Sequence, residues 1–154
     1  MKNLFKALFL VGVITGSYAQ RVVGYIPQYR TTTIMDNTIE WDKMTDAYYF
    51  GSIPNGTGGV TIEQPARFDH VKLRASQNNI NVWLSIGGWQ KSTNFPVTAS
   101  SYRTAFANEL VTLCATHGLK GIDLDWEFPT SAKKGDFKLL LQAIRQAFDA
   151  DGRL

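Results

Sequence analysis

The sequence predicts an α/β fold in which β-strands alternate with α-helices around a parallel sheet. Four short segments rich in β-branched and aromatic residues predict strands at residues 22–29, 46–53, 81–88 and 121–129. Segments with apolar residues at helical spacing follow the second, third and fourth of these strands. Strands joined through helices run parallel by right-handed crossovers, so we expect both faces of this sheet to be covered.

The first two predicted strands are VVGYIPQY at residues 22–29 and DAYYFGSI at residues 46–53. The stretch between them, which contains Trp41 and Met44, is expected to be a loop. Pro54, Asn55 and Gly56 end the second strand, because these residues favour turns. Trp41 is interpreted as a packing residue, and so is Trp83 on the third strand.

Three helices follow from apolar spacing and from glycine stops. The segment ARFDHVKLRASQ at residues 66–77 repeats apolar residues at i, i+3 and i+7. The next helix follows the strand NVWLSIGG, with Ser100 or Ser101 as its N-cap and Gly118 as its stop. The last helix ends at Gly152, and its apolar face consists of Phe137, Leu140, Leu141, Ile144 and Phe148.

The fourth strand, GIDLDWEFP at residues 121–129, alternates acidic and apolar residues. Asp123, Asp125 and Glu127 share one face of a strand, and Ile122, Leu124, Trp126 and Phe128 share the other. Taken alone, this pattern fits a half-exposed antiparallel strand whose acids lie in water.

The parallel sheet favours a different interpretation, in which the strand belongs to a (β/α)8 TIM barrel. The apolar face then points outward to the helices and the three acids point into the barrel. Enclosing several carboxylates is costly unless they are paired or protonated, so such a cluster indicates chemistry. A closed barrel needs eight strands and about 250 residues. With four strands in 154 residues, the chain is expected to be the N-terminal half of a longer, truncated barrel, and residues 152–154 to approach a fifth strand.

The N-terminus has the features of a secretory signal peptide. Lys2 and Lys6 precede an apolar run from Ala7 to Ile14, and Ser17-Tyr18-Ala19 fits a cleavage site. We therefore expect residues 1–19 to be removed and the protein to be secreted. The net charge of +3 then falls to +1, because two lysines and no acids are lost. Neither this balance nor any run of basic residues predicts nucleic-acid binding.

Few residues favour a metal or redox site. Cys114 is the only cysteine, which excludes an internal disulfide, and its helical neighbours indicate a packing role. His70 and His117 lie on different predicted helices and are expected at the surface or at helix ends. The sequence predicts no cofactor and no metal.

Two motifs in order along the chain resemble the chitinases of glycoside hydrolase family 18. The family pattern D-G-x-D-x-D-x-E on the fourth strand reads here KGIDLDWE, so that Lys120 stands where the family has its first aspartate. The family pattern S-x-G-G on the third strand reads Ser85-Ile86-Gly87-Gly88. The similarity extends to VVGYIPQY and AYYFGSI, and so covers residues 20–154 as the N-terminal half of the catalytic barrel.

The resemblance implies a role for each acid. Glu127 would protonate the leaving oxygen, with a pKa raised by its acidic neighbours. Asp125 would hold the N–H of the sugar's 2-acetamido group, and Asp123 would tune Asp125. Tyr25 and Ser85 would be hydrogen-bond partners of Asp123, although Tyr25 also fits a core position.

Other family positions imply the sugar-binding surface. Gly87 and Gly88 belong to the strand-three motif, Trp89 would stack on sugar rings, and Phe50 would form the pocket floor or else pack in the core. The family also has cis peptide bonds on its second and fourth strands, here after Tyr49 and after Glu127.

The implied activity is secreted chitin hydrolysis, in which the acetamide of the substrate serves as the nucleophile and the configuration is retained. The expected partner is chitin or another N-acetylglucosamine oligosaccharide, and the protein is expected to be a monomer without membrane association after signal cleavage. Three alternatives stay open: an endo-β-N-acetylglucosaminidase acting on glycans, a lectin-like protein that binds chitin without cleaving it, and a metal-dependent hydrolase.

Overall fold

The computed structural model describes residues 20–152. The predicted signal peptide at residues 1–19 therefore lies outside the described residues, as do residues 153–154 of the predicted approach to a fifth strand. No helix in the part of the chain from residue 20 to residue 152 has the length and apolar character to cross a membrane.

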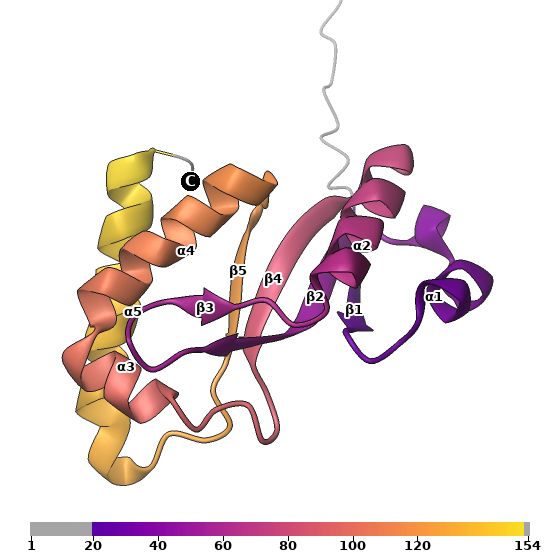
Figure 1. The fold of residues 1–154 in the computed structure, drawn as a ribbon. Helices are drawn as coiled ribbons and strands as arrows, with labels where there is room; N and C mark the ends of the chain where they lie inside the picture. Colours follow the sequence, from indigo (N-terminus) through magenta and orange to yellow (C-terminus); the bar gives the residue numbers. More distant parts are fainter. Residues whose placement is uncertain (1–19, 153–154) are drawn as a thin grey trace, which may run out of the picture.

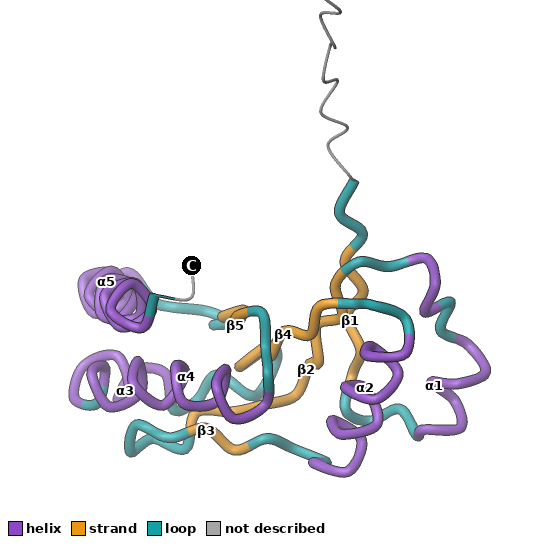
Figure 2. The backbone as a smooth tube through the Cα atoms, turned by 90° about the horizontal axis from the view of Figure 1, so that it is seen from above, coloured by secondary structure: helices purple, strands orange, loops and turns teal. Residues whose placement is uncertain are grey.

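The four predicted strands are confirmed, and they form one parallel sheet in the order β1-β2-β4-β5. The strands are β1 (Val23–Pro27), β2 (Asp46–Pro54), β4 (Asn81–Gly87) and β5 (Gly121–Asp125). Figure 2 shows them as a curved row, with α3, α4 and α5 grouped near β5 and with α1 and α2 near β1 and β2. This arc has the topology of the first four strands of a (β/α)8 barrel.

The helices differ from the predictions at several ends. They are α1 (Thr32–Thr38), α2 (Pro65–Gln77), α3 (Phe95–Ser101), α4 (Arg103–His117) and α5 (Lys134–Asp151), with short 3-10 turns at Trp41–Lys43 and Ser131–Lys133. The predicted stops at Gly118 and Gly152 are confirmed, because both glycines adopt the left-handed conformation that ends α4 and α5.

Two predictions about these connecting segments are wrong, and one short strand was not predicted. The expected loop after β1 contains α1, whose N-terminus is capped by the Thr31 side chain. A short antiparallel strand, β3 (Val60–Thr61), follows β2. Neither Ser100 nor Ser101 caps a helix, because α3 has already begun beside Pro96 and the Ser100 hydroxyl donates back to the Pro96 carbonyl at 2.9 Å.

The register of the sheet aligns side chains in rows across the strands. One row joins Tyr25, Tyr48, Trp83 and Gly121, and the next joins Pro27, Phe50, Ser85 and Asp123. In the first row the Tyr25 and Tyr48 ring centroids lie 5.2 Å apart, and Tyr48 stacks on Trp83 at the same distance. A side chain at Gly121 would lie 2.3 Å from the Trp83 ring, so the glycine makes room for this row. The packing role predicted for Trp83 is therefore confirmed.

The opposite face of the sheet packs against the helices. Ile26, Tyr49, Leu84 and Ile86 are almost fully buried there in one apolar cluster with α2, α3 and α4. Trp41 is buried in the same cluster. Cys114 is also buried on α4, which confirms its predicted packing role, and His117 is the last residue of α4.

Asp46, at the start of β2, is a buried carboxylate that joins the beginnings of three strands. Its oxygens accept hydrogen bonds from Arg21 at 2.9 Å, from the Trp83 indole at 2.7 Å and from Thr45 at 2.7 Å. Asn81, the first residue of β4, donates to it at 3.3 Å. Burial opposes ionisation, but the hydrogen bonds from Arg21, Thr45 and Trp83 outweigh it and lower the pKa of Asp46 to about 2.

β5 largely confirms the two-faced pattern that the sequence predicts. Ile122 and Leu124 pack against the apolar cluster, and Trp126 stacks on Phe95 of α3 and meets Phe137 of α5 edge-on. The outward packing predicted for Phe128 is wrong, since 73% of its side chain is exposed. The strand ends at Asp125, so the alternation does not continue to this residue.

Of the two expected cis peptide bonds, the one between Glu127 and Phe128 is present. The bond after Tyr49 is trans, and that prediction is wrong. Tyr49 and Phe50 pair in regular parallel register with both β1 and β4, and the irregularity of β2 comes only afterwards, at Gly51.

Candidate active site

The candidate site lies at the carboxyl ends of β4 and β5, where the loops that follow the two strands run side by side at the bottom of Figure 1. Asp123 and Ser85 are register partners on these strands, and Gly87 is the partner of Asp125. Parallel barrels carry their chemistry at this end, because all strands deliver their last residues there.

Asp123 is held in place by two hydroxyl groups. The Ser85 hydroxyl donates to Asp123 Oδ2 at 2.7 Å, and the Tyr25 hydroxyl donates to the same oxygen at 3.1 Å. The structure thus brings together the three residues that the sequence linked. Lys120, which stands in place of the first family aspartate, is exposed before the start of β5.

Tyr25 lies on the concave face of the sheet, opposite the side that the helices cover. Partial burial, followed by the charge and the hydrogen bond of Asp123, raises the pKa of Tyr25 to about 12. The tyrosine is therefore a hydrogen-bond donor at neutral pH. Its side chain is 57% exposed, so it is not a core aromatic residue.

Asp125 lies within the electrostatic influence of both other acids, Asp123 and Glu127. Partial burial, the charges of Glu127 and Asp123, and a hydrogen bond with Glu127 raise the pKa of Asp125. Asp125 is therefore harder to ionise than an isolated aspartate, because partial burial disfavours its charge and that charge would add to those of Glu127 and Asp123.

Gly87 and Gly88 provide room for the backbone of β5. The Gly88 N–H donates to the Asp125 carbonyl at 2.6 Å. A Cβ atom at Gly87 would lie 2.2 Å from that carbonyl oxygen, and one at Gly88 would lie 2.5 Å from the Phe50 ring. Both glycines also have positive φ angles, +107° and +98°. Only glycine fits these two positions without displacing Asp125 or Phe50.

The Phe50 ring packs against Gly88, where an added Cβ would lie 2.5 Å from it. Trp89 follows Gly88 in the sequence and lies in a turn, in which the Lys91 N–H donates to the Gly88 carbonyl at 3.0 Å. The turn holds the Trp89 side chain 68% exposed. The site end therefore presents two exposed rings, Trp89 and Phe128, with Glu127 next to Phe128 in sequence.

One residue of this site was not predicted from the sequence. Ser92, in the loop after β4, is 7% exposed, and its hydroxyl lies within hydrogen-bonding distance of Gly88, Asp125 and Glu127. All three contacts are to main-chain atoms. No side-chain pattern in the sequence could indicate them.

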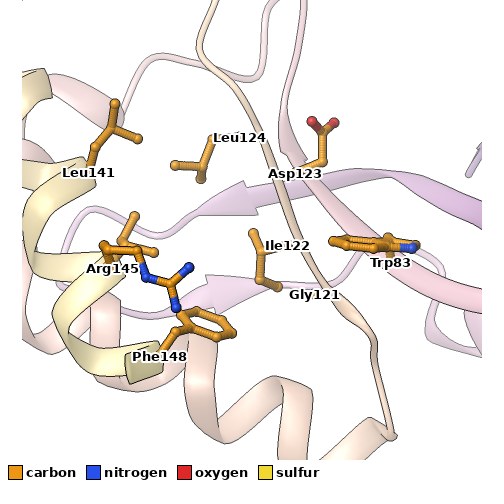
Figure 3. Close-up of a pocket in the computed structure, with 9 residues that line it drawn as sticks. Trp83, Gly121, Ile122, Asp123, Leu124, Leu141, Arg145 and Phe148 are labelled. Atoms are coloured by element: carbon orange, nitrogen blue, oxygen red, sulfur yellow. The ribbon is translucent and has the colours of Figure 1, made fainter. Parts of the chain in front are cut away.

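A separate groove lies along the side of β5 that has no partner strand among the described residues. It has a volume of about 370 Å³ and is lined mainly by Ile122, Leu124, Leu141, Ile144 and Phe148. Figure 3 shows Asp123 and Trp83 on one side of β5 and the α5 side chains Leu141, Arg145 and Phe148 on the other. The groove borders the sheet edge and does not contain Asp125 or Glu127.

Comparison with known proteins decides the family. A protein-family sequence model, described as Glycosyl hydrolases family 18, matches residues 21–153, which is most of the chain. The chain belongs to glycoside hydrolase family 18.

Among curated relatives within family 18, Endochitinase 1 of Metarhizium robertsii is 46% identical over 81 residues, covering 51% of this chain and 19% of that protein. Chitinase A1 of Niallia circulans is 29% identical over 145 residues, covering 75% of this chain and 21% of that protein. The chain thus spans about a fifth of the length of these relatives.

Solved chitinase structures have the same fold. A chitinase from Cycas revoluta, solved in complex with (GlcNAc)4, matches with a TM-score of 0.74 at 23% identity, covering 85% of this chain and 41% of that one. A chitinase from Rhizomucor miehei matches with a TM-score of 0.72 at 23% identity, covering 83% and 44%. These matches confirm that the described strands correspond to part of a (β/α)8 barrel.

The carboxylate oxygens of Asp123, Asp125 and Glu127 are potential metal ligands, which is why a metal-dependent hydrolase is one of the alternatives. Among residues 20–152, no three His, Cys, Asp or Glu side chains converge in a geometry that could hold a metal ion.

Proposed function

We propose that the protein carrying this chain hydrolyses β-1,4-linked N-acetylglucosamine polymers such as chitin, with retention of configuration. The observation that carries this proposal is the row of acids, in which the Ser85 and Tyr25 hydroxyls anchor Asp123 and in which the charges of Glu127 and Asp123 act on Asp125. The named chitinases among the relatives support the same substrate class.

In this mechanism Glu127 supplies the proton. Glu127 gives its proton to the glycosidic oxygen as the bond from that oxygen to the anomeric carbon breaks. The acetamide oxygen of the same sugar attacks the anomeric carbon, and Asp125 accepts a hydrogen bond from the acetamide N–H and stabilises the positive charge that develops. Asp123 acts on Asp125 through its charge, and Tyr25 and Ser85 hold Asp123 in the position from which it does so.

The second half of the reaction returns the enzyme to its starting state. Water attacks the anomeric carbon from the side that the leaving group vacated, and Glu127 takes a proton from that water. The acetamide is released from the anomeric carbon. Two inversions at one carbon give net retention.

The test is the Glu127→Gln substitution in the whole protein that carries this chain, assayed on (GlcNAc)4. Glutamine keeps the size of the side chain but holds no transferable proton, so we expect kcat to fall by about 10²-fold or more while binding persists. NMR of the first products should show the β-anomer. Turnover by Glu127→Gln close to the wild-type value would contradict the assignment of the general acid.

The same assay separates the alternatives. An endo-β-N-acetylglucosaminidase would release glycans from N-glycoproteins faster than it cleaves (GlcNAc)4. A lectin-like protein would bind (GlcNAc)4 and release no product at any enzyme concentration.

We further propose that the protein is secreted and acts as a monomer. The support is the N-terminal pattern of Lys2, Lys6 and the apolar run that ends before Ala19. N-terminal sequencing of protein from the culture medium should begin at Gln20. Light scattering should give the mass of one chain.

A further inference from the structure

At the candidate site, the Ser92 hydroxyl contacts main-chain atoms both in the loop after β4 and in the chain at the end of β5. No other hydroxyl among the described residues does this. Its oxygen accepts a hydrogen bond from the Glu127 N–H at 2.9 Å. The same hydroxyl lies 3.2 Å from the Asp125 carbonyl and 3.2 Å from the Gly88 carbonyl, to which it can donate. One buried group thus connects the turn that carries Trp89 with the chain on both sides of Trp126.

We propose that Ser92 is a positioning residue that holds the general acid Glu127 in line with the sugar bound against Trp89. This inference rests on the proposed function, because the reacting atom that it positions is the carboxyl group of Glu127.

The geometry explains why a hydroxyl is needed at this point. β5 ends at Asp125, so the Glu127 N–H has left the strand ladder and needs another acceptor. The Ser92 oxygen provides that acceptor, and its single hydrogen is left to bond a carbonyl. The Asp125 carbonyl already accepts the Gly88 N–H at 2.6 Å and has a second lone pair for the hydroxyl.

Within its own loop the Ser92 hydroxyl has one contact, with the Gly88 carbonyl at 3.2 Å. That loop is also closed by main-chain bonds, from Lys91 N–H to the same Gly88 carbonyl and from Phe95 N–H to the Ser92 carbonyl. Asn94, which precedes α3, uses its side chain to donate to the Pro54 carbonyl. Removing the hydroxyl should therefore leave the loop and α3 in place but release the Glu127 peptide.

The first test compares kcat and KM of the Ser92→Ala and Ser92→Thr variants on (GlcNAc)4, each made in the whole protein that carries this chain. Loss of positioning should lower kcat of Ser92→Ala by about 10–100-fold, with KM within threefold of wild type, because displacements of about 1 Å cost this much. Ser92→Thr keeps the hydroxyl and should recover at least half of the wild-type kcat. A Ser92→Ala variant within twofold of wild type, or a Ser92→Thr variant as slow as Ser92→Ala, would overturn the proposal.

Ser100→Ala is the matched control, because the Ser100 hydroxyl bonds only within α3 and its neighbour Ser101. Its kcat should equal that of wild type, and circular dichroism should show the same melting temperature for all variants within a few degrees. If Ser100→Ala lost activity as strongly as Ser92→Ala, the effect would be general destabilisation and the proposal would be wrong.

A second measurement does not depend on activity or on a folded variant. Amide hydrogen exchange of the wild-type protein, resolved to single residues, should show the Glu127 N–H protected although it lies outside β5. Exchange at the rate of an unprotected amide would overturn the inference. If the wild-type protein left (GlcNAc)4 uncut while this amide stayed protected, the proposed function would fail and the hydrogen bond on which the Ser92 inference depends would stand.

Discussion

Asp125 illustrates how a single side chain can serve chemistry at a cost in stability. Partial burial and the negative charges of Glu127 and Asp123 raise its pKa above the ordinary value of 3.8. A raised pKa in the folded state means that the ionised form is less favourable there than in the unfolded chain. The penalty is present above the folded pKa and disappears as the pH falls below 3.8.

We therefore predict that Asp125→Asn changes stability and activity in opposite directions. At pH 7 the melting temperature should rise by a few degrees, because the neutral amide carries no penalty for lost ionisation, and the difference should vanish below about pH 3.8. Turnover of (GlcNAc)4 should fall by about 10²-fold, because the acetamide N–H loses its carboxylate.

Asp149→Asn is the control for the Asp125 experiment. Asp149 is a mostly exposed partner of Arg145 on α5, and its replacement should shift stability by less than about 0.5 kcal/mol at any pH. An Asp125→Asn variant less stable than wild type at pH 7 would contradict the predicted sign.

The ends of elements, more than their middles, determine the geometry of the site. β4 ends at Gly87 and β5 ends at Asp125, and these two ends are joined by the bond from the Gly88 N–H to the Asp125 carbonyl. The turn can approach β5 this closely only because Gly87 has no side chain, since a Cβ there would lie 2.2 Å from the Asp125 carbonyl oxygen, and Gly88 likewise leaves room for the Phe50 ring.

Gly88→Ala should therefore damage the site directly. The added Cβ would lie 2.5 Å and 2.7 Å from two atoms of the Phe50 ring and 3.2 Å from Asp125 Oδ2, at a φ of +98°. We predict a loss of at least tenfold in kcat together with a lower melting temperature, measured by steady-state kinetics and by circular dichroism.

Gly135→Ala is the matched control, because Gly135 lies inside α5 and an added Cβ there meets nothing within 4 Å. Alanine should stabilise the helix by about 0.5–1 kcal/mol relative to glycine and leave kcat unchanged. If both variants behaved alike, the close approach of Gly88 to β5 would have no functional meaning.

The elements that could be predicted from the sequence are those with long or strongly patterned segments. β1, β2 and β4 have enough β-branched and aromatic residues to be recognised, and β5 is recognised by its alternating acidic and apolar residues. Gly118 and Gly152 mark the ends of α4 and α5. α1 could not be predicted, because Met35 is its only buried residue and seven residues give no periodic face. The break at Tyr102 between α3 and α4 also has no glycine or internal proline to mark it.

In the candidate site, contacts between side chains could be predicted from the sequence, whereas contacts to main-chain atoms could not. The contacts of Asp123 with Ser85 and Tyr25 follow from motifs whose side chains share one face of the sheet. The role of Ser92 depends on carbonyl and amide groups 33 and 35 residues away in the chain, which leave no side-chain signature. The exposure of Phe128 was missed because the period-two pattern continues past Asp125, where the strand itself ends.

At the scale of the whole molecule, the described sheet is an open arc. β1 and β5 each pair with one neighbour only among the described residues, and the concave face leaves Tyr25 largely exposed. Unpaired strand edges expose N–H and C=O groups that promote aggregation.

We predict that residues 20–154 expressed alone have no turnover and associate in solution. The concave face would lack the side chains that fill a closed barrel, and Asp125 and Glu127 would lack the enclosure that catalysis needs. Size-exclusion chromatography with light scattering, a thermal melt and an assay on (GlcNAc)4 together test the claim. A monomer with a cooperative melt and measurable turnover would contradict it.

The buried Asp46 also affects how the strands align during folding. Because side chains alternate between the two faces, a slip of one residue between β2 and β4 would turn Asp46 toward the helices and away from the Trp83 indole. The same slip would carry Phe50 away from Gly88, at the far end of the strands. A misaligned sheet would therefore leave a desolvated carboxylate without its hydrogen-bond donors, which is unfavourable. The correct alignment of the candidate site is thus enforced from the opposite end of the strands.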